Sequence, residues 1–446
     1  MFNKVLIANR GEIALRVIRA CRELGIKTVA VFSTADDLSL HKKFADEAIC
    51  IGPPDSLKSY MNIAAIISAA ELTNSDAIHP GYGFLSENPE FSKICNENNI
   101  TFIGPNSSII ESMGHKSTAK TTMVKAGVPV IPGSEGIVNS INDGLKIANQ
   151  LGYPIIIKAA SGGGGRGMRL VEKEEEFNNA FSSAQSESRI AFNNDEVYIE
   201  KYFTKPRHIE IQIMSDSHGN TFAFGERECS IQRRHQKLIE ESPSPAISSK
   251  IRKLMSESAI KAAKSVNYVG AGTVEFLFDQ ENEKFYFMEM NTRIQVEHPV
   301  TEFVSSIDLV KQQILCHAGL AIPKQFKNIT LRGHSIECRI NAEDPNKNFM
   351  PSPGTINSAY FPGGMGVRVD TCVYSGYTIP PNYDSMIAKI IVHAQSRIEA
   401  INKMYTSLDE CVIDGIKTNI DFQKRILKND SFIKGDINTN FLNSFL

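Results

Sequence analysis

Long apolar stretches are missing from this chain of 446 residues. No run approaches the ~20 residues that a membrane-spanning helix needs. At the N-terminus only residues 5–8 are apolar before Asn9, Arg10 and Glu12 follow, so the segment lacks the apolar core of a signal peptide. The sequence therefore predicts a soluble protein of the cytoplasm.

An excess of charge of either sign is also missing. The 48 basic and 50 acidic side chains leave a formal net charge of −2, which gives no support to a general polyanion binder, although local basic clusters remain. The hydrophobic share of 42% and the charged share of 22% are typical of globular proteins and argue against a disordered chain. At ~150 residues per domain, the length predicts about three domains.

Closely spaced cysteines are missing as well. The eight cysteines include no CxxC pair and no zinc-ribbon spacing. Scattered cysteines indicate a reducing compartment, where most of them are small buried hydrophobic residues. Cys229 follows three charged residues, and we expect it to have a structural or site-neighbouring role rather than a nucleophilic one.

The first hundred residues alternate between two kinds of pattern. The short apolar runs that predict buried strands are 4–8, 28–32, 77–79 and 101–103. The helical patterns between them cover 13–24, 62–72 and 89–98. Such alternation predicts a doubly wound parallel α/β sheet, with ligand loops such as 79–83 at the carboxyl ends of its strands.

The remaining chain indicates a mixed α+β organisation. Expected strands cover 154–158, 168–171 and 196–203, with a helix over 174–188. From about residue 204 the polar residues His208, Glu210 and Gln212 alternate with isoleucines, which predicts a strand with one polar face. Strands dominate to about 290 around a helix near 248–266, and a helix–loop–helix follows residue 394.

A glycine-rich segment, SGGGGRG, occupies 161–167. Although it contains GxGxxG, the next residues continue as a strand, so the helix that a dinucleotide site requires is missing. A Walker loop is excluded because Met168 stands where lysine is needed. The pattern predicts a hairpin whose backbone N–H groups surround phosphates, with Lys158 as a nearby positive charge; the alternative is a surface hairpin without function.

Two carboxylates stand in the middle of neighbouring strand patterns. The runs 273–278 and 285–291 are joined by a polar turn at 280–284, which predicts an antiparallel pair with Glu275 opposite Glu289. Like charges there are unfavourable unless a divalent cation neutralises them. With the Asn291 amide they form a set of hard oxygen ligands that suits Mg²⁺ or Mn²⁺. The alternative is two solvated carboxylates on an exposed face.

The next segment, 291–299, contains a cation, an amide and a carboxylate at alternate positions. In an extended chain Arg293, Gln295 and Glu297 lie on one side, where Arg293 could hold an anion and Glu297 could act as a general base. A salt-bridged strand edge explains the pattern equally well. The basic run within 226–237 is either solvated surface or an anion-binding site.

These segments together resemble a known family. The strings IANRGEIA, HPGYGFLSEN, KAASGGGGRGM, SIQRRHQK, EMNTRIQVEHPVTE, ECRINAEDP and PPNYDSMIAK are similar to those of the biotin carboxylases, an ATP-grasp family. The similarity runs from residue 2 to nearly the end. It implies an ATP-grasp fold with a Rossmann-like N-terminal domain (1–115), an ATP-grasp domain (116–330, with a lid over about 130–203) and a mixed α+β C-terminal domain (331–446).

The resemblance also implies a set of ligand-binding residues. Those expected to bind ATP are Lys116, Lys158, the lid glycines Gly162, Gly163, Gly164, Gly165 and Gly167, the adenine hinge Glu200, Lys201 and Phe203, and His208, Gln232 and His235. Phe203 departs from the family, which often has leucine there. Those expected to hold two Mg²⁺ or Mn²⁺ ions are Glu275, Glu289 and Asn291.

The same resemblance implies the reaction of an ATP-dependent ligase. Glu297 would deprotonate bicarbonate in a pocket formed by Arg293, Gln295 and the Val296 backbone, and attack on ATP would give carboxyphosphate. Lys237 would stabilise the anion. Carboxyphosphate would release CO2 and phosphate, the phosphate would take the proton of biotin N1, and Arg339 would stabilise the resulting enolate.

Partners are expected on the same basis. Because the chain has no Ala-Met-Lys-Met-like segment, biotin should arrive on a separate carrier protein, with a carboxyltransferase as a third component. Acetyl-CoA carboxylase and fatty acid synthesis are the expected context, and the alternative is a subunit of another acyl-CoA or pyruvate carboxylase. A homodimer is implied, with Arg19 and Glu23 at the contact. Competing hypotheses are another ATP-grasp ligase and a nucleotide-binding regulatory module without turnover.

Overall fold

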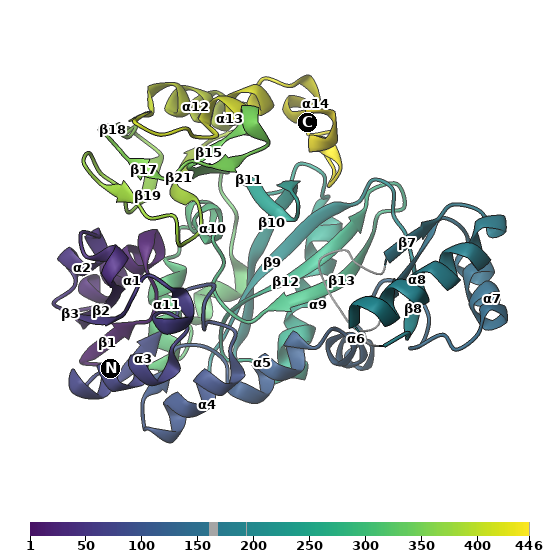
Figure 1. The fold of residues 1–446 in the computed structure, drawn as a ribbon, viewed down its shortest axis with the longest axis horizontal. Helices are drawn as coiled ribbons and strands as arrows, with labels where there is room; N and C mark the ends of the chain where they lie inside the picture. The colour runs from purple at the N-terminus through teal and green to yellow at the C-terminus, as the bar shows by residue number, and fades with distance from the viewer. Residues whose placement is uncertain (160–167, 193, 446) are drawn as a thin grey trace.

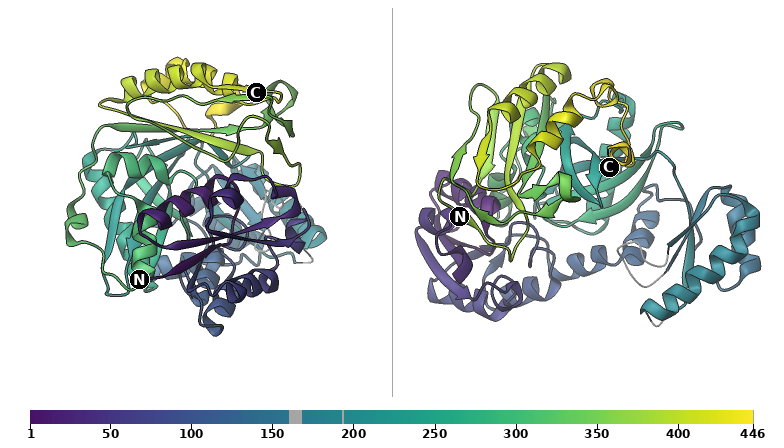
Figure 2. Two further views of the ribbon diagram at one scale, coloured as in Figure 1. Left: turned by 90° about the vertical axis from the view of Figure 1, so that its left-hand side faces the viewer. Right: turned by 45° about the horizontal axis from the view of Figure 1, so that its top comes forward.

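The computed structural model describes residues 1–159, 168–192 and 194–445. Figure 1 shows the N-terminal segment at the left, the C-terminal segment above it and a large sheet in the centre. A small sheet with two helices projects on the right of Figure 1. The right-hand view of Figure 2 also shows this sheet and its helices set apart from the rest of the molecule.

The N-terminal segment contains a five-stranded sheet in the order β3-β2-β1-β4-β5, and all of its pairs are parallel. This confirms the predicted doubly wound sheet. Its strands are β1 (Lys4–Ile7), β2 (Lys27–Ser33), β3 (Glu47–Gly52), β4 (Ala77–His79) and β5 (Thr101–Phe102). The helices are α1 (Gly11–Glu23), α2 (Leu40–Phe44), α3 (Ile63–Leu72), α4 (Pro89–Glu97), α5 (Ser107–Gly114) and α6 (Lys116–Lys125).

The projecting layer is an antiparallel sheet in the order β7-β6-β8. Its elements are α7 (Ile141–Leu151), β6 (Ile155–Ala159), β7 (Met168–Val171), α8 (Phe177–Phe192) and β8 (Val197–Lys201). Buried Phe177 and Phe181 pack this layer around a core of its own. Lys158 pairs with Met168, so antiparallel strands flank the glycine-rich segment as predicted, while the segment itself lies outside the described residues.

The large sheet has eight strands in the order β13-β12-β9-β10-β11-β14-β21-β19, and its pairs are antiparallel. The strands are β9 (Arg207–Ser215), β10 (Thr221–Arg233), β11 (Gln236–Ser242), β12 (Gly270–Asp279), β13 (Lys284–Asn291), β14 (His334–Asn341), β19 (Val367–Thr371) and β21 (Met386–Ala394). Three helices accompany it, α9 (Ser249–Ser265), α10 (His298–Ser305) and α11 (Leu309–His317). Because β11 pairs with β14, the sheet continues across residue 331.

The C-terminal segment adds helices and short strands to this sheet. The helices are α12 (Arg397–Glu410), α13 (Ile420–Leu427) and α14 (Asp430–Lys434), which lie above the sheet in Figure 1. The short strands are β15 (Glu343–Asp344), β16 (Met350–Pro351), β17 (Gly354–Thr355), β18 (Ser358–Tyr360), β20 (Thr378–Ile379) and β22 (Val412–Asp414). The predicted mixed α+β character is confirmed, with β22 in the loop between α12 and α13.

Strand β9 separates the apolar core from the polar face that carries the site. Ile209, Ile211 and Ile213 pack in one apolar cluster with residues of α9. His208, Glu210 and Gln212 alternate with them and are buried on the opposite face. Among the described residues, no helix has both the length and the apolar character that crossing a bilayer demands.

Candidate active site

A row of charged side chains crosses four neighbouring strands of the large sheet. Glu289 on β13 pairs with Glu275 on β12, which confirms the predicted register of the two carboxylates. Glu275 pairs in turn with Glu210 on β9, and Glu210 pairs with Arg227 on β10. Side chains paired in this way lie on one face of a sheet, so the row forms a continuous charged surface.

The Lys237 ammonium group joins this row to the segment before α10. Its Nζ donates to Glu210 Oε2 at 2.6 Å, Glu275 Oε1 at 3.1 Å and Glu297 Oε1 at 2.6 Å. Burial alone lowers the pKa of Lys237, but the three carboxylates raise it well above its usual value. Lys237 therefore remains charged and holds three acids around one cation.

Glu297 is the point where two chains of hydrogen bonds meet. It precedes α10 and is 2% exposed. Besides Lys237, Arg339 on β14 donates to it, from Nη2 to Oε2 at 2.9 Å, and the same guanidinium donates from Nε to Glu240 Oε1 at 2.6 Å. Burial raises the pKa of Glu297, but Lys237 and Arg339 lower it well below its usual value. Glu297 is thus an ionised carboxylate, as a general base must be.

Arg293 differs from its prediction. Residues 292–297 form a bend and a turn into α10 rather than an extended chain, so the expected alternation is wrong. Arg293 donates to Glu87 Oε2 at 2.7 Å and to Asn291 Oδ1 at 3.1 Å. Gln295 turns back towards the sheet, where its Nε2 donates to Glu275 Oε1 at 2.8 Å. In this segment Arg293 therefore forms an ion pair with Glu87, whereas Gln295 points towards the charged row at Glu275.

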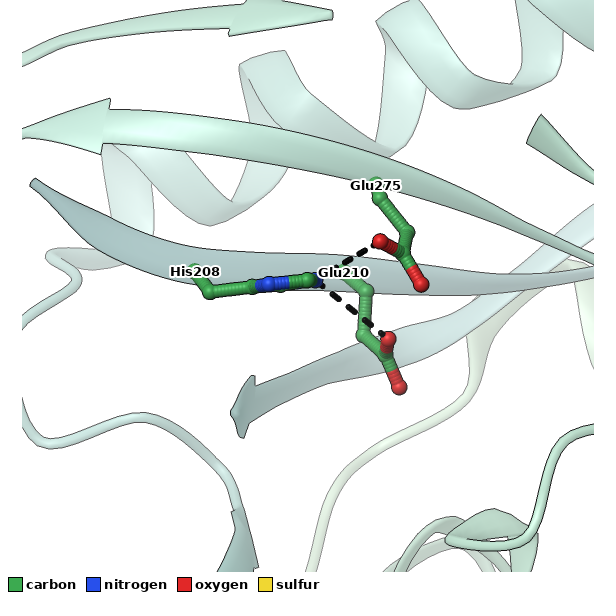
Figure 3. A group of neighbouring side chains, drawn as sticks. All are labelled: His208, Glu210 and Glu275. Carbon is green, nitrogen blue, oxygen red and sulfur yellow. Dashed lines mark ion pairs between the residues drawn. The ribbon is translucent and has the colours of Figure 1, made fainter. Parts of the chain in front are cut away.

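The predicted nucleotide residue His208 and the predicted metal ligand Asn291 both contact Glu275. His208 Nε2 lies 2.9 Å from Glu275 Oε2 and 3.9 Å from the Glu210 carboxylate, and Figure 3 shows the three side chains directed towards one another. Burial lowers the pKa of His208, but the Glu275 carboxylate raises it above its usual value. Asn291 Nδ2 donates to Glu275 Oε1 at 2.8 Å.

The other predicted ligand, Glu289, lines a cavity of about 220 Å³. Glu87, Lys116 and Asn291 line it too. Burial and the Glu275 charge raise the pKa of Glu289. Two facing carboxylates beside an amide oxygen are a donor set that fits Mg²⁺, since this ion prefers hard oxygen ligands and shares them with phosphates.

Two of the predicted nucleotide residues, Lys158 and Glu200, form an ion pair in the projecting layer. Lys158 Nζ donates to Glu200 Oε2 at 2.7 Å, and Lys120 Nζ donates to Glu200 Oε1 at 3.0 Å. Burial raises the pKa of Glu200, but the two lysines lower it below its usual value. The Phe203 ring packs against the Tyr286 ring in a tilted arrangement, with ring centroids 5.2 Å apart. Lys201 instead donates to the backbone carbonyls of residues 152 and 153.

The remaining predicted residues are more dispersed. Lys116 is exposed at the first position of α6, Gln232 is half-buried near the end of β10, and His235 is exposed in the two-residue turn before β11. The Val296 carbonyl accepts from Lys389 Nζ at 2.7 Å. The lid glycines Gly162, Gly163, Gly164, Gly165 and Gly167 lie outside the described residues. Cys229 is fully buried, and burial raises the pKa of its thiol, as its expected structural role requires.

Several charged residues of the site were not singled out from the sequence. They are Glu87, Lys120, Arg227, Glu240 and Lys389. Arg227 is fully buried and donates to Glu210, Gln212, Thr273, Gln295 and Thr301. For Arg227, Glu240 and Lys389 the available signal was charge inside strand patterns, because a charged residue in a strand buried on both faces needs a partner. Glu87 lies before α4 and Lys120 lies in α6, so this signal does not apply to them.

Comparison with known proteins accounts for this arrangement. The chain is 55% identical over 445 residues to "Biotin carboxylase 1" of Bacillus subtilis, with 100% of this chain and 99% of the relative covered. The chain belongs to the biotin carboxylase family. Three family models match in order: "Biotin carboxylase, N-terminal domain" over residues 1–110, "Carbamoyl-phosphate synthase L chain, ATP binding domain" over 115–325 and "Biotin carboxylase C-terminal domain" over 337–444.

Solved biotin carboxylase structures have the same fold. A "Biotin Carboxylase-beta-gamma-ATP Complex from Campylobacter jejuni" is 52% identical with a TM-score of 0.92, and 100% of this chain and 99% of that one are covered. The biotin carboxylase domain dimer of the Hydrogenobacter thermophilus 2-oxoglutarate carboxylase, in complex with MgADP, ADP and bicarbonate, is 47% identical with a TM-score of 0.90 and coverage of 100% and 98%. The predicted family, fold and class of ATP-dependent carboxylase ligase are thereby confirmed.

Proposed function

We propose that this biotin carboxylase transfers CO2 from bicarbonate to biotin on a carrier protein, with ATP hydrolysis, as the first half-reaction of acetyl-CoA carboxylase. One observation carries this proposal. Lys237 binds Glu275 of the metal-type carboxylate pair and also Glu297, while Glu297 binds Arg339. The residues for phosphoryl transfer and those for biotin therefore meet at one buried carboxylate.

Nucleotide binding would involve two layers of the molecule. The ATP-grasp unit over 116–330, with its lid over about 130–203, would hold ATP; in the sequence it follows the N-terminal unit (1–115) and precedes the C-terminal unit (331–446). Lys116, Lys158 and the lid glycines would bind the phosphates, and Glu200, Lys201 and Phe203 with His208, Gln232 and His235 would surround the nucleoside. Glu275, Glu289 and Asn291 would hold Mg²⁺ or Mn²⁺, which when bound neutralises phosphate charge.

In the first step Glu297 would act on bicarbonate. It is ionised, so it can accept the bicarbonate proton while Arg293, Gln295 and the Val296 backbone hold the anion. The freed oxygen attacks the γ-phosphorus, and the bond to ADP breaks. Lys237 offsets the negative charge that develops, because its ammonium already lies among the acids of the site.

In the second step carboxyphosphate would divide into CO2 and phosphate. The phosphate removes the proton of biotin N1, and the nitrogen then bonds to CO2. Arg339 would stabilise the intermediate enolate, since its guanidinium reaches the same carboxylate as Lys237. Water must be excluded meanwhile, because carboxyphosphate is readily hydrolysed.

We infer partners and surroundings on the same basis. A biotin-bearing carrier protein would bring its ureido ring to Arg339, and a carboxyltransferase would receive the carboxylated carrier. A homodimer is favoured, with Arg19 and Glu23 at its contact; both line a groove of about 440 Å³ with Arg16 and Arg368. The cytoplasm is the proposed location.

The test is ADP release by the whole chain with Mg²⁺, bicarbonate and free biotin. We expect release to depend on bicarbonate and to be stimulated by biotin, whereas another ATP-grasp ligase would need a different carboxylate and a regulatory module would not turn over. Glu297→Ala should abolish turnover and leave ATP affinity nearly unchanged. Equal loss of turnover and ATP affinity would contradict the assigned role of Glu297.

A further inference from the structure

Two glutamates face each other beside Arg339, and neither has a role in the reaction described above. Glu240 on β11 and Glu337 on β14 are register partners in an antiparallel pair. Both are fully buried, at 0% exposure. Directly paired side chains on one face of a sheet have Cβ atoms about 5 Å apart, so the two carboxyl groups are within reach of each other.

Three of the four carboxyl oxygens of this pair lack a hydrogen-bond donor among the described residues. Glu240 Oε1 accepts from Arg339 Nε at 2.6 Å, but Glu240 Oε2 and both oxygens of Glu337 find no partner among the residues that the structure describes. An ionised carboxylate buried in this way is strongly unfavourable. One proton between the facing groups would satisfy both, because a protonated carboxyl donates a hydrogen bond and its neighbour accepts it.

The cations near Glu337 (Arg339 and Lys389) already bind other groups. Arg339 is shared between Glu240 and Glu297. Lys389, opposite Arg339 on β21, donates to the Val296 carbonyl and lies 3.3 Å from Glu12, and Asp370 lies at 3.9 Å. No cation in the described chain is thus left to pair with Glu337.

The other titratable groups around the pair add little compensation. Lys237 acts on Glu240 but binds three other acids. The other titratable groups that interact with the pair are Glu297, the Tyr82 hydroxyl and the buried thiols of Cys229 and Cys338. Burial raises the pKa of Glu337 well above its usual value, despite Lys389, and Glu240 adds to this. Burial likewise raises the pKa of Glu240 to about 7, against the effect of Arg339.

We propose that Glu240 and Glu337 form an acid pair that holds one proton, with Glu337 protonated and Glu240 ionised, and that Glu240 is a positioning residue for Arg339. The anion on Glu240 holds the guanidinium through Nε at 2.6 Å and Nη2 at 2.5 Å, and in this orientation Nη2 also reaches Glu297 Oε2 at 2.9 Å. The action of Arg339 on biotin rests on the proposed function, whereas the protonation of the pair does not.

The acid pair makes the biotin step sensitive to pH. When the pH falls through the range in which the pair takes a second proton, Arg339 loses the anion that orients it. Biotin-dependent turnover should therefore fall on the acid side of its pH profile. Because the two groups are coupled, this acid limb reports the pair rather than one residue.

Isosteric variants test whether Glu337 is the protonated member of the pair and Glu240 the ionised one. In Glu337→Gln the side-chain amide N–H replaces the carboxyl O–H as donor to Glu240, so kcat/KM for biotin should remain within about threefold of the native value. The acid limb of the pH profile of this variant should shift. In Glu240→Gln the anion is lost, and kcat/KM for biotin should fall about 10- to 100-fold, the range for a buried charge-assisted hydrogen bond. Equal losses in the two variants would overturn the proposal.

Infrared difference spectroscopy tests the proton without reference to activity. The native protein near neutral pH should show the C=O band of a protonated carboxylic acid, and Glu337→Gln should lose it. Glu241→Gln is the matched control, because Glu241 is also buried but binds His334 and Arg397, which hold its pKa at about 2, so the band should remain. Absence of the band from the native protein would refute the acid pair, and failure of biotin carboxylation alone would refute only the proposed function.

Discussion

Replacement of Arg227 by methionine should destabilise the protein severely. The guanidinium is fully buried and donates to the Glu210 carboxylate, to the amide oxygens of Gln212 at 2.7 Å and Gln295 at 2.9 Å, and to two threonine hydroxyls at 3.0 Å. Breaking a buried ion pair costs about 3–5 kcal/mol, and each orphaned amide oxygen adds about 1 kcal/mol. We expect a loss of about 5 kcal/mol, since Lys237 still compensates Glu210.

Thermal unfolding of the native and variant proteins measures this loss. At about 2 °C per kcal/mol for a protein of this size, Tm should fall by about 10 °C. Arg227→Lys should recover part of the loss, because one ammonium can bind Glu210 but cannot reach both amides. Arg189→Met is the control; its pair with Asp195 is exposed, and the cost should be below about 1 kcal/mol. A shift for Arg227→Met as small as that of the control would refute the reasoning.

Two further predictions concern titration and thiol chemistry. Despite burial, His334 and Arg397 lower the pKa of Glu241 to about 2, and Arg16 lowers the pKa of Glu302 to about 2. Each carboxylate therefore adds stability above about pH 4.5 that is lost as the pH falls towards 2, and Tm should drop steeply in that range. An unchanged Tm between about pH 4.5 and about pH 2 would contradict this prediction. Of the eight cysteines only Cys50 is exposed, so a thiol reagent followed by mass spectrometry should label Cys50 first, and rapid labelling of a second cysteine would contradict the burial pattern.

Local patterns in the sequence predicted most elements and one central feature of the site. The parallel N-terminal sheet followed from alternating apolar runs, and the facing of Glu275 and Glu289 followed from a hairpin with a short turn. Strand β3 was missed, because most of its residues are half-buried or exposed and give no apolar run. The family resemblance supplied what periodicity could not, namely the reaction and the expected ligands.

Contacts between residues that are distant in the sequence could not be predicted from local sequence patterns. Lys237 and Glu240 are three positions apart, which in a regular strand places them on opposite faces, yet both belong to the cluster around Glu297 and Arg339. A register shift of β10 against β11 near Ile231 makes this possible. The contact of Arg293 with Glu87 joins segments 206 positions apart, which no spacing rule indicates.

The continuity of the large sheet limits how this molecule can be divided. Cutting the chain near residue 331 would uncover the facing edges of β11 and β14, whose backbone groups are paired across that boundary. Newly bared strand edges recruit other chains, so either fragment should aggregate instead of folding alone. The projecting three-stranded layer has a separate core, and a shortened or exchanged version of it is the more promising target for protein engineering.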